Sequence, residues 1–498
     1  MDITELANKH SEDINIQQSL SSQIPNDYNT EEDEDKKIIS DKEQSKPQVA
    51  ESVCPPQGRF NKCITNGFLL FMIWFAISSV SSHGRYPNEN SFGLLFVFCC
   101  SLIAGKLLQV CRIPSMPPLP PLLGMLLAGF TIRNAPYISE HVHISSDWSS
   151  TIRNIALTLI LIKAGLGLDI QALKRLRNVC LRLSFGPCLM EACAAAVISH
   201  FLLNFPWQWG FLLGFVVGAV SPAVVVPSML KLQEDGYGIE KGIPTILMAA
   251  SSVDDILAIT GFSIFMTIVF SSGGVLQDVL ISFRNVVIGV LLGTFMGIFL
   301  QYFPSADQTN LPVKRACLIL SLCVSVVLVG NSMGIHGTGG LFTLMLTFIG
   351  GMNWNRDKIG VQKLITFAWE IFQPLLFGLV GLEVSVAALK SDAIGVSIAC
   401  LFLALLVRIS ATFFLVTFTG FNFKEKIFIA FSWIPKATVQ AVLGPLALET
   451  ARISSPHLEG YAKDVMTIAF LAILITAPNG ALLINILGPR LLARYDPN

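Results

Sequence analysis

The stretch GIPTILMAASSVDDILAITGFSIFMTIVF, from Gly242 to Phe270, decides the fold class of this chain. It is long enough to cross a lipid bilayer, which takes about 20 apolar residues. Near its middle stand two adjacent carboxylates, Asp254 and Asp255. Because an ionised carboxylate at the centre of a bilayer costs at least ~2.5 kcal/mol, acids inside a membrane span indicate a functional site.

The composition of the whole chain is that of a polytopic membrane protein, since 52% of its 498 residues are hydrophobic and 14% are charged. The formal net charge of zero conceals an uneven distribution. Residues 1–52 hold 13 acidic residues and 5 lysines, a balance of −8, which leaves +8 for the rest of the chain. We therefore expect residues 1–58 to form a disordered acidic cytosolic tail and residues 59–498 to form a transmembrane domain. A regulatory or partner-binding role for the tail stays open.

Apolar runs separated by charged or Gly/Pro-rich loops predict an all-α protein of about 14 transmembrane helices. These runs begin near residues 64, 92, 119, 152, 181, 209, 243, 281, 316, 340, 364, 394, 427 and 465. The loops that carry most lysines and arginines fall on one side, so the positive-inside rule predicts that both termini are cytosolic. We expect an integral multi-pass protein of the plasma membrane, and endosomal, mitochondrial and flagellar membranes stay open.

A weak internal repeat relates the two halves of the chain. Gly167-Leu168-Asp169 resembles Gly381-Leu382-Glu383, and the prolines Pro222 and Pro435 follow these triplets at nearly the same distance. The two copies begin at the fourth and eleventh predicted spans. An odd shift makes the copies enter the bilayer in opposite directions, which is the inverted repeat of a secondary transporter.

The sixth span, GFLLGFVVGAVSPAVVVPSML, and the thirteenth, IFIAFSWIPKATVQAVLGPLAL, each carry a proline near the middle, Pro222 and Pro435. Proline removes a backbone donor, so both helices are predicted to break and to aim half-helix ends at the bilayer midplane, although packed kinks are the alternative. Lys436 is expected to neutralise helix C-terminal carbonyls, with ion binding as the alternative. Ser221 is either a weak ion ligand or a serine bonded within its own helix.

Asp254 and Asp255 are turned by about 100° from each other on a helix, so we expect one to bind an ion and the other to steer it or pair with another group. A buried carboxylate can hold a proton and exchange it for a monovalent cation at the same oxygens. Carboxylate, hydroxyl and carbonyl oxygens favour Na⁺ or Li⁺, and no cofactor is expected. The alternative is a buried structural ion pair.

Glu191 and Arg408 are the other charges in the middle of predicted spans. A salt bridge between them that joins two core helices is the first interpretation, and a contact of Arg408 with one aspartate is the second. Arginine stays protonated in either arrangement, so Arg408 cannot itself deliver the proton.

With these features the chain resembles the cation/proton antiporter superfamily, and the segments MAASSVDDILAITGF, AGFTIRN, FQPLLFGLVGLEVSV and PKATVQAVLGPLALETAR resemble the animal NHA-type sodium/hydrogen exchangers, subfamily B of the solute-carrier exchangers. The resemblance implies a homodimer in the membrane lipid, a core or transport part at roughly residues 181–270 and 394–490, and a dimerisation panel from the remaining spans. It also implies elevator-like alternating access and a role in pH homeostasis.

The resemblance assigns the ion-binding carboxylate to Asp255. Arg408 departs from the lysine of bacterial electrogenic relatives, which favours exchange of one cation for one proton, whereas the paired aspartates favour the electrogenic branch. Ser221 stands where some relatives have an aspartate, so a direct ion contact from that span is in question.

Other classes of protein fit the pattern less well. Intramembrane aspartyl proteases place their two aspartates on different helices, one of them in a GxGD sequence, whereas here the aspartates are neighbours. A sodium-coupled organic-anion symporter shares crossed broken helices but has little use for paired acids beside an arginine, and it stays as the alternative function. Nothing in the sequence supports an enzyme or a nucleic-acid partner. The prediction is therefore a secondary active sodium or lithium/proton antiporter.

Overall fold

The computed structural model describes residues 89–110, 119–168, 177–270, 275–305, 308–333, 335, 338–386, 391–417 and 419–494, together with a few residues between 65 and 75. These residues form helices and no strand. The predicted acidic tail, residues 1–58, lies outside the described residues, and the first predicted span lies largely outside them.

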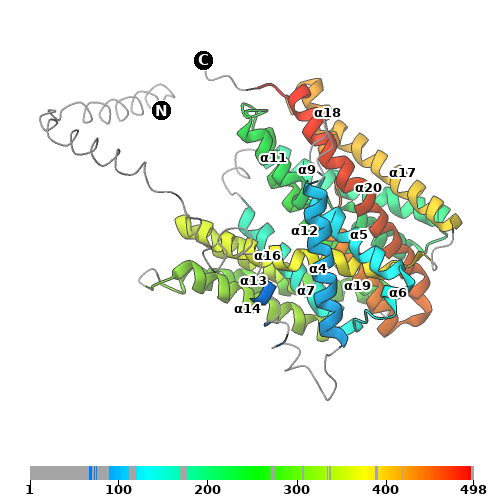
Figure 1. Ribbon diagram of the computed structural model, residues 1–498. Coiled ribbons are helices and arrows are strands. Elements are labelled where there is room, and N and C mark those ends of the chain that lie inside the picture. The colour runs from blue at the N-terminus through cyan, green and yellow to red at the C-terminus, as the bar shows by residue number, and fades with distance from the viewer. Residues whose placement is uncertain are drawn as a thin grey trace, which may run out of the picture. The chain divides into compact units, whose positions relative to one another are not determined.

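Two groups of helices follow from the contacts among the described residues. The first, which we call the core group, holds the aspartate pair, and α12 contacts five of its other helices. Most of the helices are labelled in Figure 1. Its members are α9 (Arg177–Leu202), α10 (Trp207–Gly218), α11 (Pro222–Glu234), α12 (Ile243–Phe270), α17 (Ser391–Val416), α18 (Phe423–Ser432), α19 (Thr438–Ser454) and α20 (Glu459–Leu491).

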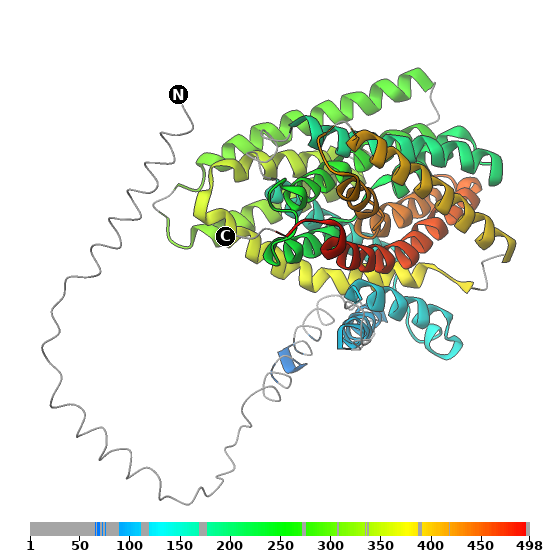
Figure 2. The ribbon, with the colours of Figure 1, turned by 90° about the horizontal axis from the view of Figure 1, so that it is seen from above.

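The second group, which we call the panel group, contains helices that contact one another more than they contact the core group. Figure 2 shows the described helices from above, in the colours of Figure 1. Its members are α4 (Glu89–Val110), α5 (Pro121–Asn134), α7 (Ser146–Gly167), α13 (Val275–Tyr302), α14 (Leu311–Ser332), α15 (Thr338–Gly350) and α16 (Asn355–Glu383). The short helices α6 (Pro136–Ser139), η1 (Gly351–Asn353) and η3 (Pro456–Leu458) lie between longer ones in the chain. The groups meet where α12 contacts α7, α13 and α15, where α19 contacts α7 and α16, and where α20 contacts α5.

The predicted spans from the second to the fourteenth each coincide with a helix or with a pair of half-helices. Within the described residues, 10 helical segments are long and apolar enough to cross a membrane, with α10 and α11 taken together as one of them. The all-α multi-pass fold is thus confirmed. The total of 14 spans stays a prediction, because α5, α15, α18 and α19 are each shorter than that criterion requires.

Two breaks interrupt the core group at the predicted places. Ala219, Val220 and Ser221 separate α10 from α11, and residues 433–437 separate α18 from α19. Pro222 occupies the first position of α11, where its missing N–H has no helical partner to lose. The prolines that lie inside α9, α16 and α20 leave those helices continuous.

Candidate functional site

The two breaks cross each other in the core group. The backbone N–H of Ser221 donates to the carbonyl oxygen of Pro435 at 2.8 Å, which joins the first break directly to the second. Gly480 of α20 leaves room for the Pro435 ring, since a side chain there would overlap it. The crossing therefore depends on a close approach between α20 and the second break.

Side chains from other helices cap the carboxyl end of α10. Gln440 Nε2 donates to the carbonyls of Val216 at 3.0 Å and Ala219 at 2.9 Å. Lys436 Nζ donates to the carbonyl of Val217. Arg408 Nη1 donates to the carbonyl of Gly218. The last four carbonyls of this half-helix thus have protein donors and need no ion to satisfy them.

A chain of alternating charges extends from this cap to the first aspartate. Lys436 Nζ lies 2.8 Å from Glu191, Arg408 Nη1 lies 2.6 Å from Glu191 Oε2, and Arg408 Nη2 lies 2.9 Å from Asp254 Oδ2. The side chains of all four residues are fully buried. Arg408 therefore contacts both of its proposed partners, and Lys436 joins a side-chain network as well as a helix end.

Asp254 is held within this network by two donors. Its Oδ2 accepts from Arg408 and from the backbone N–H of Val220, the latter at 2.7 Å. Two charge-assisted hydrogen bonds on one buried oxygen stabilise the ionised carboxylate. Asp254 thereby anchors α12 to both α17 and the first break.

Asp255 has different surroundings although it is the next residue. It is 1% exposed, and neither of its carboxylate oxygens has a hydrogen-bond partner among the described residues. A buried carboxylate without donors is costly unless a proton or a cation neutralises it. Asp255 is therefore the carboxylate in this site whose two oxygens are both available to a proton or a cation.

A cavity of about 650 Å³ reaches Asp255 from the boundary between the two helix groups. Its core-group wall includes Pro222, Ser252 and Thr438, and its panel-group wall includes Lys163, Trp369 and Glu370. Hydroxyl groups beside one carboxylate form a donor set that suits an alkali-metal cation. Within the described part of the chain, no group of three or more His, Cys, Asp or Glu residues is placed to hold a metal ion.

Ser221 lies next to Thr438 across the two breaks. Their hydroxyl oxygens are 3.4 Å apart, and Thr438 N donates to Ser221 Oγ at 3.4 Å. The serine hydroxyl thus faces the start of α19 and not its own helix. Thr438, unlike Ser221, is among the residues that line the cavity.

Sequence reasoning did not single out Gln440, Thr438, Ser252 or Thr476. Thr476 Oγ1 accepts from the backbone N–H of Lys436 at 2.9 Å and so holds the second break against α20. The signal for Gln440 was available in the sequence, because an amide side chain inside an apolar span needs hydrogen-bond partners when buried. The hydroxyl residues carry no such signal, since serine and threonine are satisfied within many helices.

A second set of ion pairs joins the two helix groups away from the cavity. Arg153 of α7 lies 3.5 Å from Glu383 of α16 and 3.2 Å from Glu449 of α19. Arg452 of α19 lies 3.2 Å from Glu383 and from Glu459. These contacts link α19 to the panel group.

Comparison with known proteins defines the class of this chain. Residues 94–487 match the family model described as "Sodium/hydrogen exchanger, transmembrane". That match covers most of the chain, and the chain belongs to the sodium/hydrogen exchanger family. It is an integral membrane protein.

Curated relatives agree with this assignment, and a solved structure has a similar fold. The chain is 61% identical to Sodium/hydrogen exchanger 9B1 of Homo sapiens over 503 residues, covering 100% of this chain and 98% of that protein. It is 54% identical to Sodium/hydrogen exchanger 9B2 of Homo sapiens over 444 residues, covering 89% and 83%. The sodium proton antiporter MjNhaP1 from Methanocaldococcus jannaschii, at pH 8, has a similar fold, with a TM-score of 0.65, 20% identity, and coverage of 81% of this chain and 99% of that one.

Proposed function

We propose that this protein is a secondary active sodium/proton antiporter in which Asp255 is the shared binding site for the cation and the proton. The observation that carries the proposal is the contrast at Asp255, whose oxygens are buried and without a partner in the described residues while a cavity of about 650 Å³ reaches it. Because the cation and the proton would bind the same carboxylate in turn, one must leave before the other binds, which makes their exchange obligatory. The family and the names of the relatives support sodium as the cation, and Li⁺ is proposed as a second substrate because it favours the same oxygen ligands.

The cation would be held by Asp255 together with neutral oxygens. Ser252 and Thr438 line the same cavity and supply hydroxyl groups. The carbonyls at the end of α10 are engaged by Gln440, Lys436 and Arg408, which leaves hydroxyls as the protein ligands beside the carboxylate. No resident cofactor takes part in this proposal.

The charges around the site favour an electroneutral exchange. In their ionised forms Lys436 and Arg408 balance Glu191 and Asp254, so the network of four sums to zero and Asp255 adds one negative charge. One proton or one monovalent cation neutralises Asp255 equally. Since both loaded states then carry the same charge, we propose that one cation is exchanged for one proton.

Alternating access is proposed to move the core group against the panel group. The cavity lies between these groups and its wall includes Lys163 and Glu370, which belong to helices whose nearby loops are rich in lysine and arginine. By the positive-inside rule this is the cytosolic side, so the present arrangement corresponds to an inward-open state. We further propose a homodimer formed through the panel group, with both termini in the cytosol.

Proteoliposomes with an entrapped pH dye test the proposal. A sodium or lithium gradient without any organic substrate should change the internal pH, and Asp255→Cys should abolish the change while the protein still folds and dimerises. Recording current in the same vesicles tests the stoichiometry, since electroneutral exchange produces none. Transport at the normal rate by Asp255→Cys would contradict the site assignment.

The sodium-coupled organic-anion symporter is not supported by the family match, which names exchangers. Uptake of a labelled organic anion in these vesicles, with no pH change, would favour the symporter over the antiporter.

A further inference from the structure

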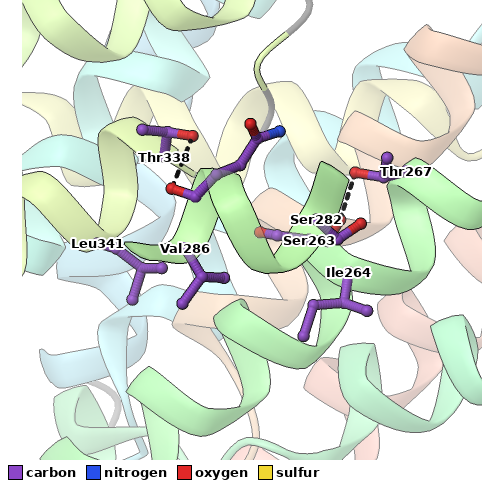
Figure 3. A pocket seen from close by; sticks show the side chains of 8 residues that line it. Ser263, Ile264, Thr267, Ser282, Val286, Thr338 and Leu341 are labelled. Carbon is purple, nitrogen blue, oxygen red and sulfur yellow. Dashed lines mark hydrogen bonds between the residues drawn. The ribbon is translucent and has the colours of Figure 1, made fainter. Parts of the chain in front are cut away.

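Helix α12 carries hydroxyl side chains on both sides of the aspartate pair. Thr245 and Ser252 line the large cavity together with Asp255. Ser263 and Thr267, farther along the helix, line a second and much smaller pocket against α13 and α15 (Figure 3). Ser252 and Ser263 are separated by about three full turns at roughly 3.6 residues per turn, so they lie on the same face of α12.

Five of the eight residues that line the second pocket are polar, and Ile264, Val286 and Leu341 complete the lining. Ser263, Ser282 and Asn285 are 8%, 3% and 7% exposed. Thr338 Oγ1 donates to the carbonyl of Asn285 at 3.3 Å, and Thr267 Oγ1 donates to the carbonyl of Ser263 at 3.1 Å (Figure 3). The pocket has a volume of about 10 Å³, which is room for about one water molecule. Several hydroxyl and amide groups around one small space inside an apolar helix bundle can hold water or a passing ion.

An apolar layer separates the two cavities. Ile259 lies between Ser252 and Ser263 on the same face of α12 and is 5% exposed. It lies near Gly340 of α15 and Leu161 of α7, since a Cβ added at that glycine would be in ordinary contact with Ile259 Cγ2 at 3.8 Å and with Leu161 Cδ1 at 3.4 Å. Ile259, which is one turn from Asp255 and one turn from Ser263, thus places an apolar side chain between the two polar regions of α12, and Leu161 belongs to the same buried cluster.

The smaller pocket also lies on the boundary between the two helix groups. Ser263 and Thr267 belong to the core group, whereas Ser282, Asn285 and Thr338 belong to the panel group. Along α12, Asp255 is separated from Ser263 by a rise of about 12 Å. Ile259 moves together with Asp255, so a displacement of α12 along its own axis by one or two turns carries both residues past Leu161 of the panel group and brings Asp255 toward these panel-group oxygens.

We propose that the pocket between α12, α13 and α15 is the closed outer half of the ion pathway. Ser263 and Thr267 on one side, and Ser282 and Asn285 on the other, would replace water around a partly dehydrated Na⁺ or Li⁺ as it passes between Asp255 and the aqueous side opposite the large cavity. The inference rests on the proposed antiporter function and adds the residues that line the second half of its route.

Two threonines of α12 provide a matched test. Thr267 and Thr260 each donate to the carbonyl four residues earlier, at 3.1 and 2.7 Å, and of the two only Thr267 lines the pocket. Each lost oxygen ligand should reduce the binding free energy of the passing ion by about that of one hydrogen bond. Thr267→Val and Ser282→Ala should therefore each lower the sodium/proton exchange rate about fivefold. Thr260→Val, and Thr267→Ser, which keeps the hydroxyl, should stay within about twofold of the original rate.

A labelling experiment reads the pathway without relying on rate. In proteoliposomes that are exchanging sodium for protons, Ser263→Cys should react with a charged, membrane-impermeant methanethiosulfonate reagent, and peptide-level mass spectrometry should locate the label. Cys188 of α9, which is 0% exposed, serves as the internal control and should stay unmodified. A Ser263→Cys side chain as unreactive as Cys188 would overturn the inference.

The failure of this inference can be told apart from the failure of the proposed function. If Asp255→Asn stops exchange while Thr267→Val exchanges as fast as Thr260→Val, the pathway assignment is wrong and the antiporter stands. If the unmodified protein exchanges no sodium for protons, both fall. Thermal denaturation of each variant separates a slowed pathway from an unfolded protein, and the Ser263→Cys labelling supplies an answer if one valine variant does not fold.

Discussion

The two neighbouring aspartates of α12 face two different regions of the molecule. Behind Asp254 lies a layer of fully buried, paired charges that contacts the end of α10. Asp255 lines a cavity that also contains hydroxyl groups. Its two carboxylate oxygens have no hydrogen-bond partner among the described residues. Residues of the first region hold the crossing in place, and residues of the second are available for a ligand. Under the proposed function, adjacent positions of one helix would serve different roles, Asp254 in stability and Asp255 in transport.

The largest expected effect separates the two aspartates. Asp255→Asn should reduce sodium/proton exchange below detection while thermal stability stays the same or rises, because it removes a buried charge that has no partner. Asp254→Asn should instead lower stability, since Arg408 then loses one of its buried acceptors. Exchange assays and thermal denaturation on both variants check this. Equal losses of stability in the two variants would contradict the proposed difference in role between Asp254 and Asp255.

The next effect concerns the buried arginine. Arg408→Ala should lower the free energy of unfolding by about 3–5 kcal/mol, because it leaves two carboxylates buried without their shared partner. Arg452→Ala is the matched control, since that arginine also contacts two glutamates but its side chain is 40% exposed. Exposed pairs contribute about 0–1 kcal/mol. Chemical or thermal unfolding in detergent gives both values, and a similar cost for the two arginines would contradict the buried-layer interpretation.

A double-mutant cycle tests whether this layer acts as a unit. Glu191→Ala and Arg408→Ala should together cost less than the sum of their separate effects, with a coupling of about 0.5–3 kcal/mol. The 2.6 Å contact between their side chains is the physical reason. Strict additivity of the two effects would show that the contact adds nothing to stability.

The pH dependence of sodium transport tests the proposed role of the second region, the cavity at Asp255. If a proton and a cation compete for Asp255, as we propose, lowering the pH by one unit should raise the half-saturating sodium concentration by up to about tenfold wherever proton binding dominates. The maximal rate at saturating sodium should change much less. Initial rates across a sodium series at several pH values measure this. A fall in maximal rate at constant half-saturation would mean that the proton acts elsewhere.

The smallest expected effect lies among the hydroxyl groups of the cavity. Thr438→Val should weaken sodium binding by about fivefold, since one neutral oxygen ligand is worth roughly one hydrogen bond. Thr450→Val in the same helix is the control, because its hydroxyl bonds the carbonyl of Leu446 at 2.9 Å and does not line the cavity. Half-saturation by sodium should be unchanged in the control and raised in Thr438→Val.

Sequence patterns predicted the all-α multi-pass fold and the places of both breaks. Long apolar runs have few structural solutions in a membrane, since every backbone group must be satisfied within the helix. Prolines alone did not decide the breaks, as the continuous helices around Pro187, Pro374 and Pro478 demonstrate. What distinguished Pro222 and Pro435 was their related position in the two halves of the chain.

The partners of the buried charges were less accessible to sequence reasoning. Glu191, Arg408, Lys436 and Asp254 were each recognisable as charges in apolar spans, yet their order of contact depends on how α9, α12, α17 and the second break meet. Gln440 went unnoticed because its two acceptors are backbone carbonyls, which every residue type offers equally. Side chains that bond to backbone leave no complementary residue in the sequence to find.

By itself the sequence determined that this chain crosses a membrane repeatedly and carries charges where lipid cannot tolerate them. Hydropathy is a sum over neighbouring residues in the sequence, so it can be evaluated without knowing the tertiary structure. Only the tertiary structure decided that Asp254 is enclosed by donors while Asp255 meets a cavity. That distinction arises because a rotation of about 100° between neighbours on a helix turns them toward different partners, and those partners come from parts of the chain far apart in sequence.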